Sequence, residues 1–142
     1  MMATGNPKGI QGLDDLIRDD IRFINRQPGS GTRQWLDESL KKEGIASNRI
    51  HGYGDMINTH TEIARKIASG KADAGVGLQA SATMFKLDFI PLFNERYDLV
   101  TDRSNLALTS PILDLIQSRD FRNDLSQFPG YDNSHSGELI QL

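Results

Sequence analysis

Short apolar runs rich in β-branched and aromatic residues alternate with longer polar segments along most of the chain. Runs of about four to eight such residues, bounded by glycine, proline or polar clusters, are typical of buried strands. The pattern predicts strands at residues 21–24, 49–53, 73–77, 89–93 and 97–101.

Amphipathic segments with helical spacing lie between these runs. In residues 58–69 the apolar positions recur with the helical period, Thr59 or Asn58 can cap the start, and Gly70 ends the segment. Other segments contain no helix breaker or end at a similar glycine. The helices predicted are residues 14–20, 32–43, 58–69, 79–86 and a segment after residue 105 that is capped by Ser110 and has Pro111 as its first residue.

Strands that alternate with helices through short loops indicate a mostly parallel sheet with helices on both faces. The predicted fold class is therefore α/β. In such sheets ligands bind beyond the carboxyl ends of the strands, in the loops that lead into helices. Residues 26–33, RQPGSGTR, form one of these loops, after a strand and before a helix.

Composition narrows the classes of function. The 142 residues are 37% hydrophobic and 25% charged, which is ordinary for one globular domain. The net charge of -3 argues against direct nucleic-acid binding, which needs a concentrated surface of lysine and arginine. The absence of cysteine excludes disulfides, thiolate nucleophiles and cysteine-based metal sites. No apolar run is long enough to span a membrane.

The RQPGSGTR loop leads into a helix start that lacks acid. The first N–H groups of a helix have no partner within the helix, and the helix dipole adds positive potential there. Proteins usually place Asp or Glu in this turn, but residues 30–36 contain neither, and Arg33 adds a cation. We therefore expect an external anion at Ser30, Gly31 and Thr32, where bare backbone and hydroxyl groups donate hydrogen bonds.

An ordinary N-cap explains the same loop equally well. Serine and threonine commonly cap helices and glycine permits the turn, so the loop by itself does not separate the two interpretations. Known phosphate-binding motifs do not match. The chain has no GxxxxGK run, and Gln34 stands where a dinucleotide-binding fingerprint needs its third glycine.

Two further loops are predicted to lead into helices from the same edge, residues 52–55 and residues 75–79. Both contain glycines, which allow a ligand to approach the backbone closely. Tyr53 and Gln79 can donate hydrogen bonds to a ligand, although a packed aromatic ring and a surface amide are the more frequent roles. From these loops the candidate binding site includes Tyr53, Asp55, Gly77 and Gln79.

No group of residues indicates catalysis or a metal site. His51, His60 and His135 are not spaced as metal ligands, and surface or capping roles explain them better. The paired aspartates of residues 14–20 suit a solvated face, and Trp35 suits packing against the sheet. Because no nucleophile, base and orienting group occur together, we predict a binding protein without a cofactor and not an enzyme.

Several segments together resemble a known family. They are GNPKGIQGLDDL, RFINRQPGSGTRQWLD, HTEIARKIASGKADAGVGLQA, IPLFNERYDLVTDR and PGYDNSHSGEL, all within residues 5–139. This succession resembles the type II periplasmic-binding-protein fold. Within that fold it is most similar to molybdate- or tungstate-binding-like domains, which also occur attached to DNA-binding regulators and molybdopterin-biosynthesis proteins.

The resemblance implies two α/β lobes that close over a ligand about a strand hinge. It also implies that oxyanions are held by hydroxyl and backbone N–H groups at helix starts. Carried over residue by residue, the binding loop of the family corresponds to Ser30, Gly31 and Thr32 with Arg33 beside them, and its glycine-ended strand corresponds to Gly75 and Gly77.

The same resemblance implies how the chain is divided. Residues 5–102 would form the ligand-binding α/β lobe with its hinge strands, and residues 103–142 would form helices and a tail that return toward the other lobe. Family members carry an N-terminal segment that builds most of the first lobe, whereas this sequence opens near the first hinge strand. We therefore expect one lobe and part of the second, either as a portion of a longer protein or as a homodimer that completes the missing lobe.

Two functions follow from the resemblance. The first is a solute-binding domain for a small oxyanion, with molybdate or tungstate as first candidates, in transport with an ABC-transporter permease or in sensing. The second is a ligand-sensing regulatory module attached to a DNA-binding or molybdopterin-biosynthesis domain. Both use the same site, so the sequence does not separate them. No signal peptide is recognised in the sequence, so its location is left open: we expect a cytoplasmic chain as written and a periplasmic one if an upstream export signal was trimmed.

Overall fold

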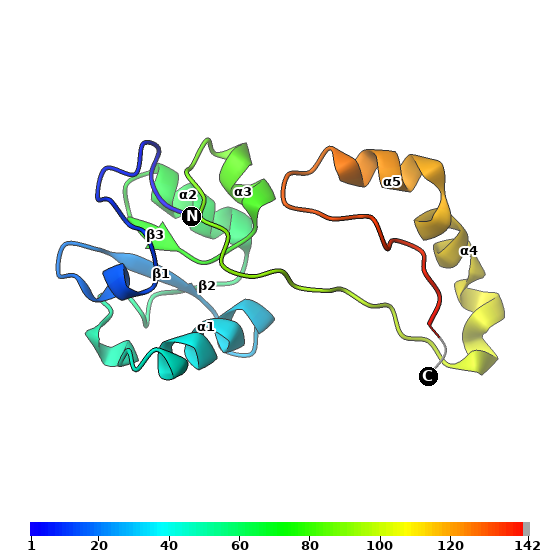
Figure 1. Ribbon diagram of the computed structural model, residues 1–142, viewed down its shortest axis with the longest axis horizontal. Helices are drawn as coiled ribbons and strands as arrows, with labels where there is room; N and C mark the ends of the chain where they lie inside the picture. The colour runs from blue at the N-terminus through cyan, green and yellow to red at the C-terminus, as the bar shows by residue number, and fades with distance from the viewer. Residues whose placement is uncertain (141–142) are drawn as a thin grey trace. The chain divides into compact units, whose positions relative to one another are not determined.

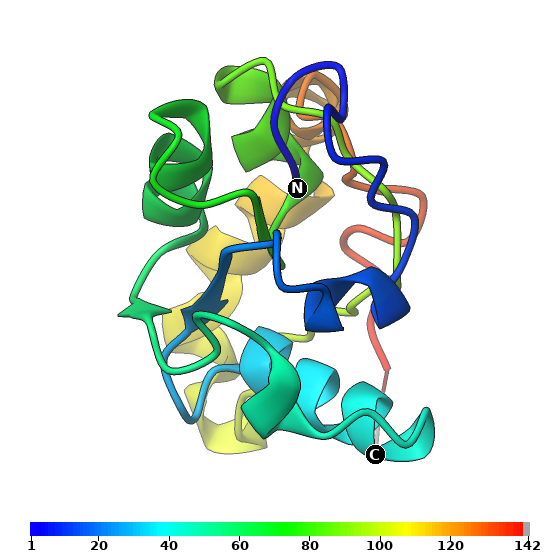
Figure 2. The ribbon, with the colours of Figure 1, turned by 90° about the vertical axis from the view of Figure 1, so that its left-hand side faces the viewer.

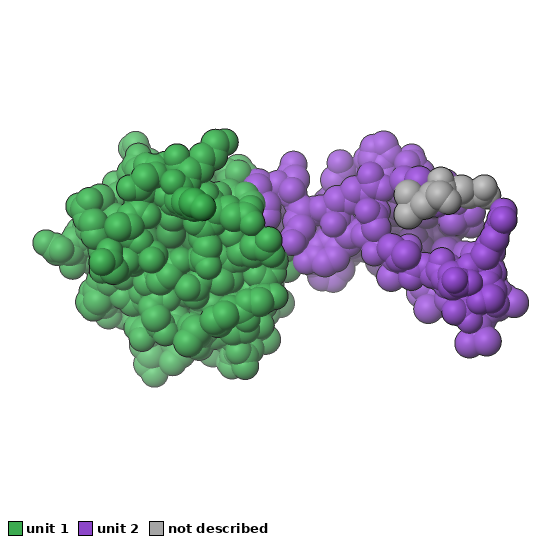
Figure 3. Space-filling model, turned by 90° about the horizontal axis from the view of Figure 1, so that it is seen from below, with its two compact units in different colours: residues 1–92 green, residues 93–142 purple. Residues whose placement is uncertain are grey.

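The computed structural model describes residues 1–140. The chain forms two compact units, residues 1–92 and residues 93–142 (Figures 1 and 3). The predicted division at residues 102 and 103 concerns the lobes of a larger fold and stays a prediction. In the first unit the elements are η1 (Asp14–Ile17), β1 (Phe23–Arg26), α1 (Gly31–Lys42), η2 (Ser47–Arg49), β2 (Met56–Ile57), α2 (His60–Ala68), β3 (Ala74–Gly75) and α3 (Gln79–Met84). In the second they are η3 (Arg103–Asn105), α4 (Leu106–Gln117) and α5 (Arg119–Ser126).

The centre of the first unit is a parallel sheet of three strands in the order β2-β1-β3. Asn25 of β1 pairs with Met56 of β2, and Phe23 of β1 pairs with Ala74 of β3. Since both pairings are parallel, the carboxyl ends of all three strands lie at one edge. The parallel α/β fold class is confirmed.

Helices cover both faces of this sheet (Figures 1 and 2). Phe23 and Ile24 are neighbours on β1 and enter different clusters of buried residues, because successive side chains of a strand point to opposite faces. On the Phe23 face, α1 contributes Leu36 and Leu40. On the Ile24 face, α2 contributes Ile63. Burying each such side chain stabilises the fold by about 1.5–3 kcal/mol.

The second strand begins later than the pattern predicts. The prediction of a strand at residues 49–53 is wrong, because the chain forms η2 and a turn there and β2 starts only at Met56. Gly52 has a φ of 86°, and a Cβ at this position would overlap the carbonyl oxygen of Phe23. The N–H of Asp55 donates to the Gly52 carbonyl at 2.9 Å, which closes the turn. Glycine therefore turns the chain where the apolar pattern indicates extended backbone.

Residues 89–93 and 97–101 do not form strands, contrary to the prediction. Asp88 makes an isolated bridge to Met2, and no strand follows it in the described chain. Leu99 and Val100 are 71% and 84% exposed. A strand needs a hydrogen-bonded neighbour, and an apolar composition does not supply one.

The second unit is helical. The prediction that a helix starts at Ser110 and Pro111 is wrong, because α4 starts at Leu106 and both residues lie inside it. Pro111 has no N–H to donate to the Ala107 carbonyl, and the Ser110 hydroxyl donates to that carbonyl at 3.1 Å. None of residues 93–140 is buried. No helix in the described part of the chain has the length and apolar character of a membrane span.

Candidate functional site

The carboxyl ends of the three parallel strands define one edge of the sheet. β1 ends at Arg26, β2 at Ile57 and β3 at Gly75, and short loops lead from them into α1, α2 and α3. The N-terminal ends of three helices therefore follow this edge. In α/β proteins ligands bind at such an edge.

Ser30 caps α1. Its Oγ accepts a hydrogen bond from the Arg33 N–H at 3.2 Å, and its hydroxyl donates to the Gln27 carbonyl at 3.1 Å. The N-cap interpretation is therefore correct for Ser30, and the cap satisfies one N–H of the first turn. Thr32 is 7% exposed, so its side chain has little contact with solvent. Gly31 is exposed and lets solvent or a ligand approach the backbone.

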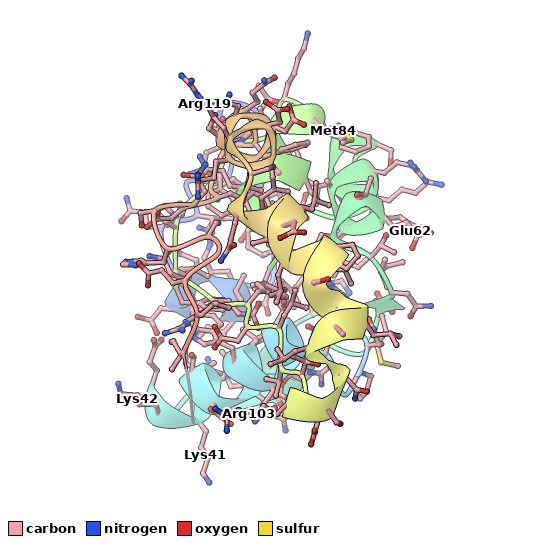
Figure 4. The ribbon with its side chains drawn as sticks, turned by 90° about the vertical axis from the view of Figure 1, so that its right-hand side faces the viewer. Lys41, Lys42, Glu62, Met84, Arg103 and Arg119 are labelled. Carbon is pink, nitrogen blue, oxygen red and sulfur yellow. The ribbon has the colours of Figure 1, made fainter. Side chains whose placement is uncertain are left out.

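The N-terminal end of α1 has no acidic side chain of its own. Its first turn contains no Asp or Glu, whereas its last turn carries Lys41 and Lys42, which complement the negative end of the helix (Figure 4). The more common arrangement occurs in α2, where Thr59 is the cap and Glu62 supplies an acid in the first turn. The start of α1 therefore favours an external anion more than the start of α2 does.

Arg33 does not add an uncompensated charge to this helix start. Its Nε donates to Oδ1 of Asp37 at 2.7 Å, and its Nη1 donates to the Arg26 carbonyl at 3.3 Å. The guanidinium lies 4.3 Å from the ring centroid of Tyr53, and the Tyr53 hydroxyl donates to Asp37. Burial, together with this hydrogen bond, raises the pKa of Tyr53. The three side chains compensate one another and line an open hollow beside α1.

The loop of residues 52–55 precedes β2 and does not follow it, because the strand lies later in the chain than predicted. Tyr53 contacts Arg33, so the structure brings these two predicted residues together. Asp55 is exposed, and its backbone carbonyl accepts the Asn25 N–H at 2.9 Å. This loop therefore enters β2 and does not lead from its carboxyl end into α2.

Gly77 and Gln79 follow β3 on the other side of β1 from β2. Gly77 packs closely against the start of α2, since a Cβ at this position would lie 3.0 Å from Nδ1 of His60. Gln79 is exposed and is the first residue of α3. Both residues lie beyond the carboxyl end of a strand, as expected.

Arg26 and His60 form a pair that the sequence interpretation missed. Nη1 of Arg26, the last residue of β1, lies 2.7 Å from Nε2 of His60, the first residue of α2. Burial of the ring, and then the charge of Arg26, lower the pKa of His60 to about 4. The ring is therefore neutral at neutral pH. The available signals were the first arginine of RQPGSGTR and a histidine directly after the cap Thr59.

The described residues contain no group of three His, Asp or Glu side chains placed to hold a metal ion. The carboxyl edge instead offers backbone N–H groups and one arginine, which is held by a neutral histidine. The N–H groups and the arginine can donate hydrogen bonds to a bound molecule, and they suit the recognition of an acceptor-rich ligand.

Comparison with known protein families shows which family the chain belongs to. The profile of a family described as "PBP superfamily domain" matches residues 1–117. The chain belongs to the PBP superfamily. This assignment agrees with the parallel α/β sheet and its helices on both faces. Domains of the PBP superfamily are in general solute-binding domains, which agrees with a site at the carboxyl edge.

Two relatives are similar over long stretches. Uncharacterized protein YvgK of Bacillus subtilis (strain 168) is 44% identical over 139 residues, which are 98% of this chain and 45% of that protein. An uncharacterized protein in the ferredoxin 2Fe-2S gene 5' region of Clostridium pasteurianum is 34% identical over 108 residues, 74% of this chain and 96% of that protein. The chain therefore spans less than half the length of the Bacillus relative. No solved structure matches the chain.

Neither the PBP superfamily description nor the names of the relatives specify a ligand. The chemistry of the ligand has to come from the residues at the carboxyl edge. Those residues are the start of α1, the Arg26–His60 pair and the loop after β3.

Proposed function

We propose that the chain is a solute-binding domain that holds a small oxyanion at the N-terminal end of α1, with molybdate and tungstate as the first candidates. One observation carries the proposal: this helix end follows the carboxyl edge of the sheet, is exposed at Gly31 and has no acid in its first turn. Membership in the PBP superfamily supports the solute-binding part.

A small oxyanion suits the groups at this helix start. Backbone N–H groups and the helix dipole stabilise negative charge without a counter-ion. Arg33 is near, but its ion pair with Asp37 offsets its charge, so the backbone supplies the principal donors. A neutral sugar would gain less from this end, because it carries no charge to interact with the dipole.

The same site serves transport or sensing. In transport the partner is an ABC-transporter permease, and in sensing it is a DNA-binding or molybdopterin-biosynthesis domain attached to this domain. The greater length of the Bacillus relative, of which the match covers 45%, favours further protein next to this domain. A second copy of the chain that completes a cleft is the other arrangement we propose.

The substitution Gly31→Glu tests the site by giving α1 an acid of its own. Without ligand, we expect it to raise the melting temperature relative to Gly31→Gln, which has a similar size and no charge. We also expect it to abolish the rise in melting temperature that sodium molybdate or tungstate produces in Gly31→Gln. Both variants are made in the protein expressed from its full reading frame.

Sulfate and phosphate serve as comparison anions in this assay. An equal molybdate-induced shift in Gly31→Glu and Gly31→Gln would show that the anion binds elsewhere. A wild-type protein that none of the four anions stabilises would overturn the oxyanion assignment itself.

A further inference from the structure

Arg26 has no carboxylate partner in residues 1–140, although it ends the central strand at the carboxyl edge. Its Nε donates to Oε1 of Gln27 at 3.2 Å, and its Nη1 lies 2.7 Å from Nε2 of His60. Both partners are neutral when His60 is deprotonated. By contrast, Arg22 and Arg33 each form an ion pair with an aspartate. The positive charge of Arg26 therefore stays uncompensated within the described chain.

The contact with Arg26 fixes the tautomer of His60. A guanidinium can only donate hydrogen bonds, so Nε2 of His60 must accept and the single proton of the neutral ring must be on Nδ1. Nδ1 is buried and has no hydrogen-bond partner among the described residues. Gly77 packs against it, because a Cβ there would lie 3.0 Å away.

The buried Nδ1–H of His60 destabilises the fold, and a side chain that only had to hold Arg26 in position could avoid this loss. A buried N–H without an acceptor loses its hydrogen bonds to water and gains none in the folded chain, so it destabilises the fold. An aspartate or glutamate in place of His60 would hold the guanidinium at least as firmly, but it would also offset its charge. A neutral histidine holds the guanidinium in position and leaves its positive charge available.

We propose that Arg26 binds the negative charge of the ligand and that His60 is the positioning residue that holds Arg26 without neutralising it. This inference rests on the proposed function and makes the ligand of the site an anion bound by two kinds of donor. The planar guanidinium contacts two of its oxygens, and the backbone N–H groups at the start of α1 contact the others. The ligand is therefore an anion with several oxygens and not a neutral solute.

Binding of sodium molybdate and sodium tungstate, measured by calorimetry in the protein expressed from its full reading frame, tests this inference. We expect His60→Gln to bind within about threefold of wild type, because glutamine is also a neutral acceptor. We expect His60→Glu and Arg26→Gln each to weaken binding by at least about tenfold, because one neutralises the guanidinium and the other removes it. Melting temperatures without ligand show whether each variant is folded.

The tautomer of His60 gives a second measurement that needs neither ligand nor a variant of His60. In ¹⁵N NMR spectra at neutral pH we expect Nδ1 of His60 to carry the proton, with exposed His51 as an internal comparison. In Arg26→Ala the donor is lost, and we expect the proton to move to Nε2. A wild-type His60 protonated on Nε2 would overturn the positioning role, even if His60→Glu fails to fold.

The outcomes separate this inference from the proposed function. If wild type binds an oxyanion and both His60→Glu and Arg26→Gln bind it equally well, the inference is wrong and the proposed function stands. If wild type binds neither molybdate nor tungstate, nor sulfate nor phosphate, the proposed function fails and the inference fails with it.

Discussion

Single glycines determine where backbone segments come close together in the first unit. Gly52 combines a φ of 86° with a Cβ position that would overlap the Phe23 carbonyl. Gly54 lies in the same loop, but no atom lies within 4 Å of its Cβ position. The contact with β1 therefore requires a glycine at position 52 and not at position 54.

The substitution Gly52→Ala should destabilise the chain by about 2 kcal/mol or more, because the added Cβ meets strand β1 and the backbone must keep a left-handed conformation. The matched control Gly54→Ala should change the free energy of unfolding by less than about 1 kcal/mol. Urea unfolding followed by circular dichroism measures both changes. Equal unfolding midpoints for the two variants would show that a Cβ at position 52 does not clash with β1.

We expect the folded chain to lose stability as the pH falls, because folding lowers the pKa of His60. Burial and then Arg26 lower its pKa to about 4 in the folded chain, whereas the unfolded chain keeps a value near 6.5. Between these two values the unfolded state binds more protons, so stability decreases as the pH falls through this window. We expect a loss of about 1–2 kcal/mol from this residue, after allowing for solvent screening of the partly buried ring.

The substitution His60→Gln should remove this part of the pH dependence, whereas His135→Gln should not, because the hydrogen bond with Glu138 raises the pKa of His135 and that shift acts in the opposite direction. Melting temperatures between about pH 7 and pH 4 measure the slope. The same slope in wild type and His60→Gln would contradict the assignment of the proton uptake to this ring.

The sequence indicates the anion-favouring loop but not the Arg26–His60 pair. The absence of acid from residues 30–36 can be read along the chain, because the start of a helix is a local feature. Arg26 and His60 are 34 positions apart and meet only when β1 and α2 pack together. A pattern of residue types does not show which distant side chains will pair, so the sequence alone favours a surface or capping role for the histidine.

At the level of elements, the two long helices of the first unit could be predicted closely, whereas the strands could be predicted only in part. The predicted helices 32–43 and 58–69 are close to α1 and α2, because caps and apolar stripes are encoded within each segment. By contrast, β2 and β3 contain two residues each. Pairing with β1 sets their bounds, and that information is not local.

Asp73 joins the starts of β1 and β3 with the N-terminal loop. Its carboxylate accepts the Arg22 main-chain N–H at 2.8 Å and the Arg22 Nε at 3.0 Å, and it lies 3.3 Å from Nζ of Lys8. Hydrogen bonds from the Arg22 side chain are the largest cause that lowers the pKa of Asp73 to about 2. The ionised carboxylate therefore stabilises the contact between these elements.

The substitution Asp73→Asn should destabilise the chain by about 2 kcal/mol at neutral pH, because it removes charge-assisted hydrogen bonds. An exposed aspartate provides the control: Asp19→Asn should change stability by less than about 0.5 kcal/mol.

Folding lowers the pKa of Asp73 from 3.8 to about 2. The ionised carboxylate therefore stabilises the folded chain fully above the unfolded pKa, and this stabilisation is lost as the pH falls to about 2. Urea midpoints of wild type and Asp73→Asn should therefore converge at low pH, and a constant difference would contradict this origin.

At the scale of the whole molecule, the two units differ in what stabilises them. All buried residues of the described chain lie in residues 1–92. The sequence shows that α4 has an apolar stripe, but it does not show whether another surface covers that stripe. Helices of 12 and 8 residues without a buried face are only marginally stable in water. The apolar residues that α4 exposes are Leu106, Leu108, Ile112 and Leu115.

A chain that ends at Leu92 should therefore fold with nearly the stability of the whole chain. We expect the free energy of unfolding to change by less than about 1 kcal/mol, because the buried apolar surface that drives folding is retained. The slope of unfolding free energy against urea should also change little, since it follows the surface exposed on unfolding.

A chain that ends at Met84 is the control. It lacks buried Leu87 and the Met2–Asp88 bridge, so it should lose at least about 2 kcal/mol. If the chain ending at Leu92 is destabilised as much as this control, or has a much smaller slope, residues 93–142 contribute to the core of the sheet.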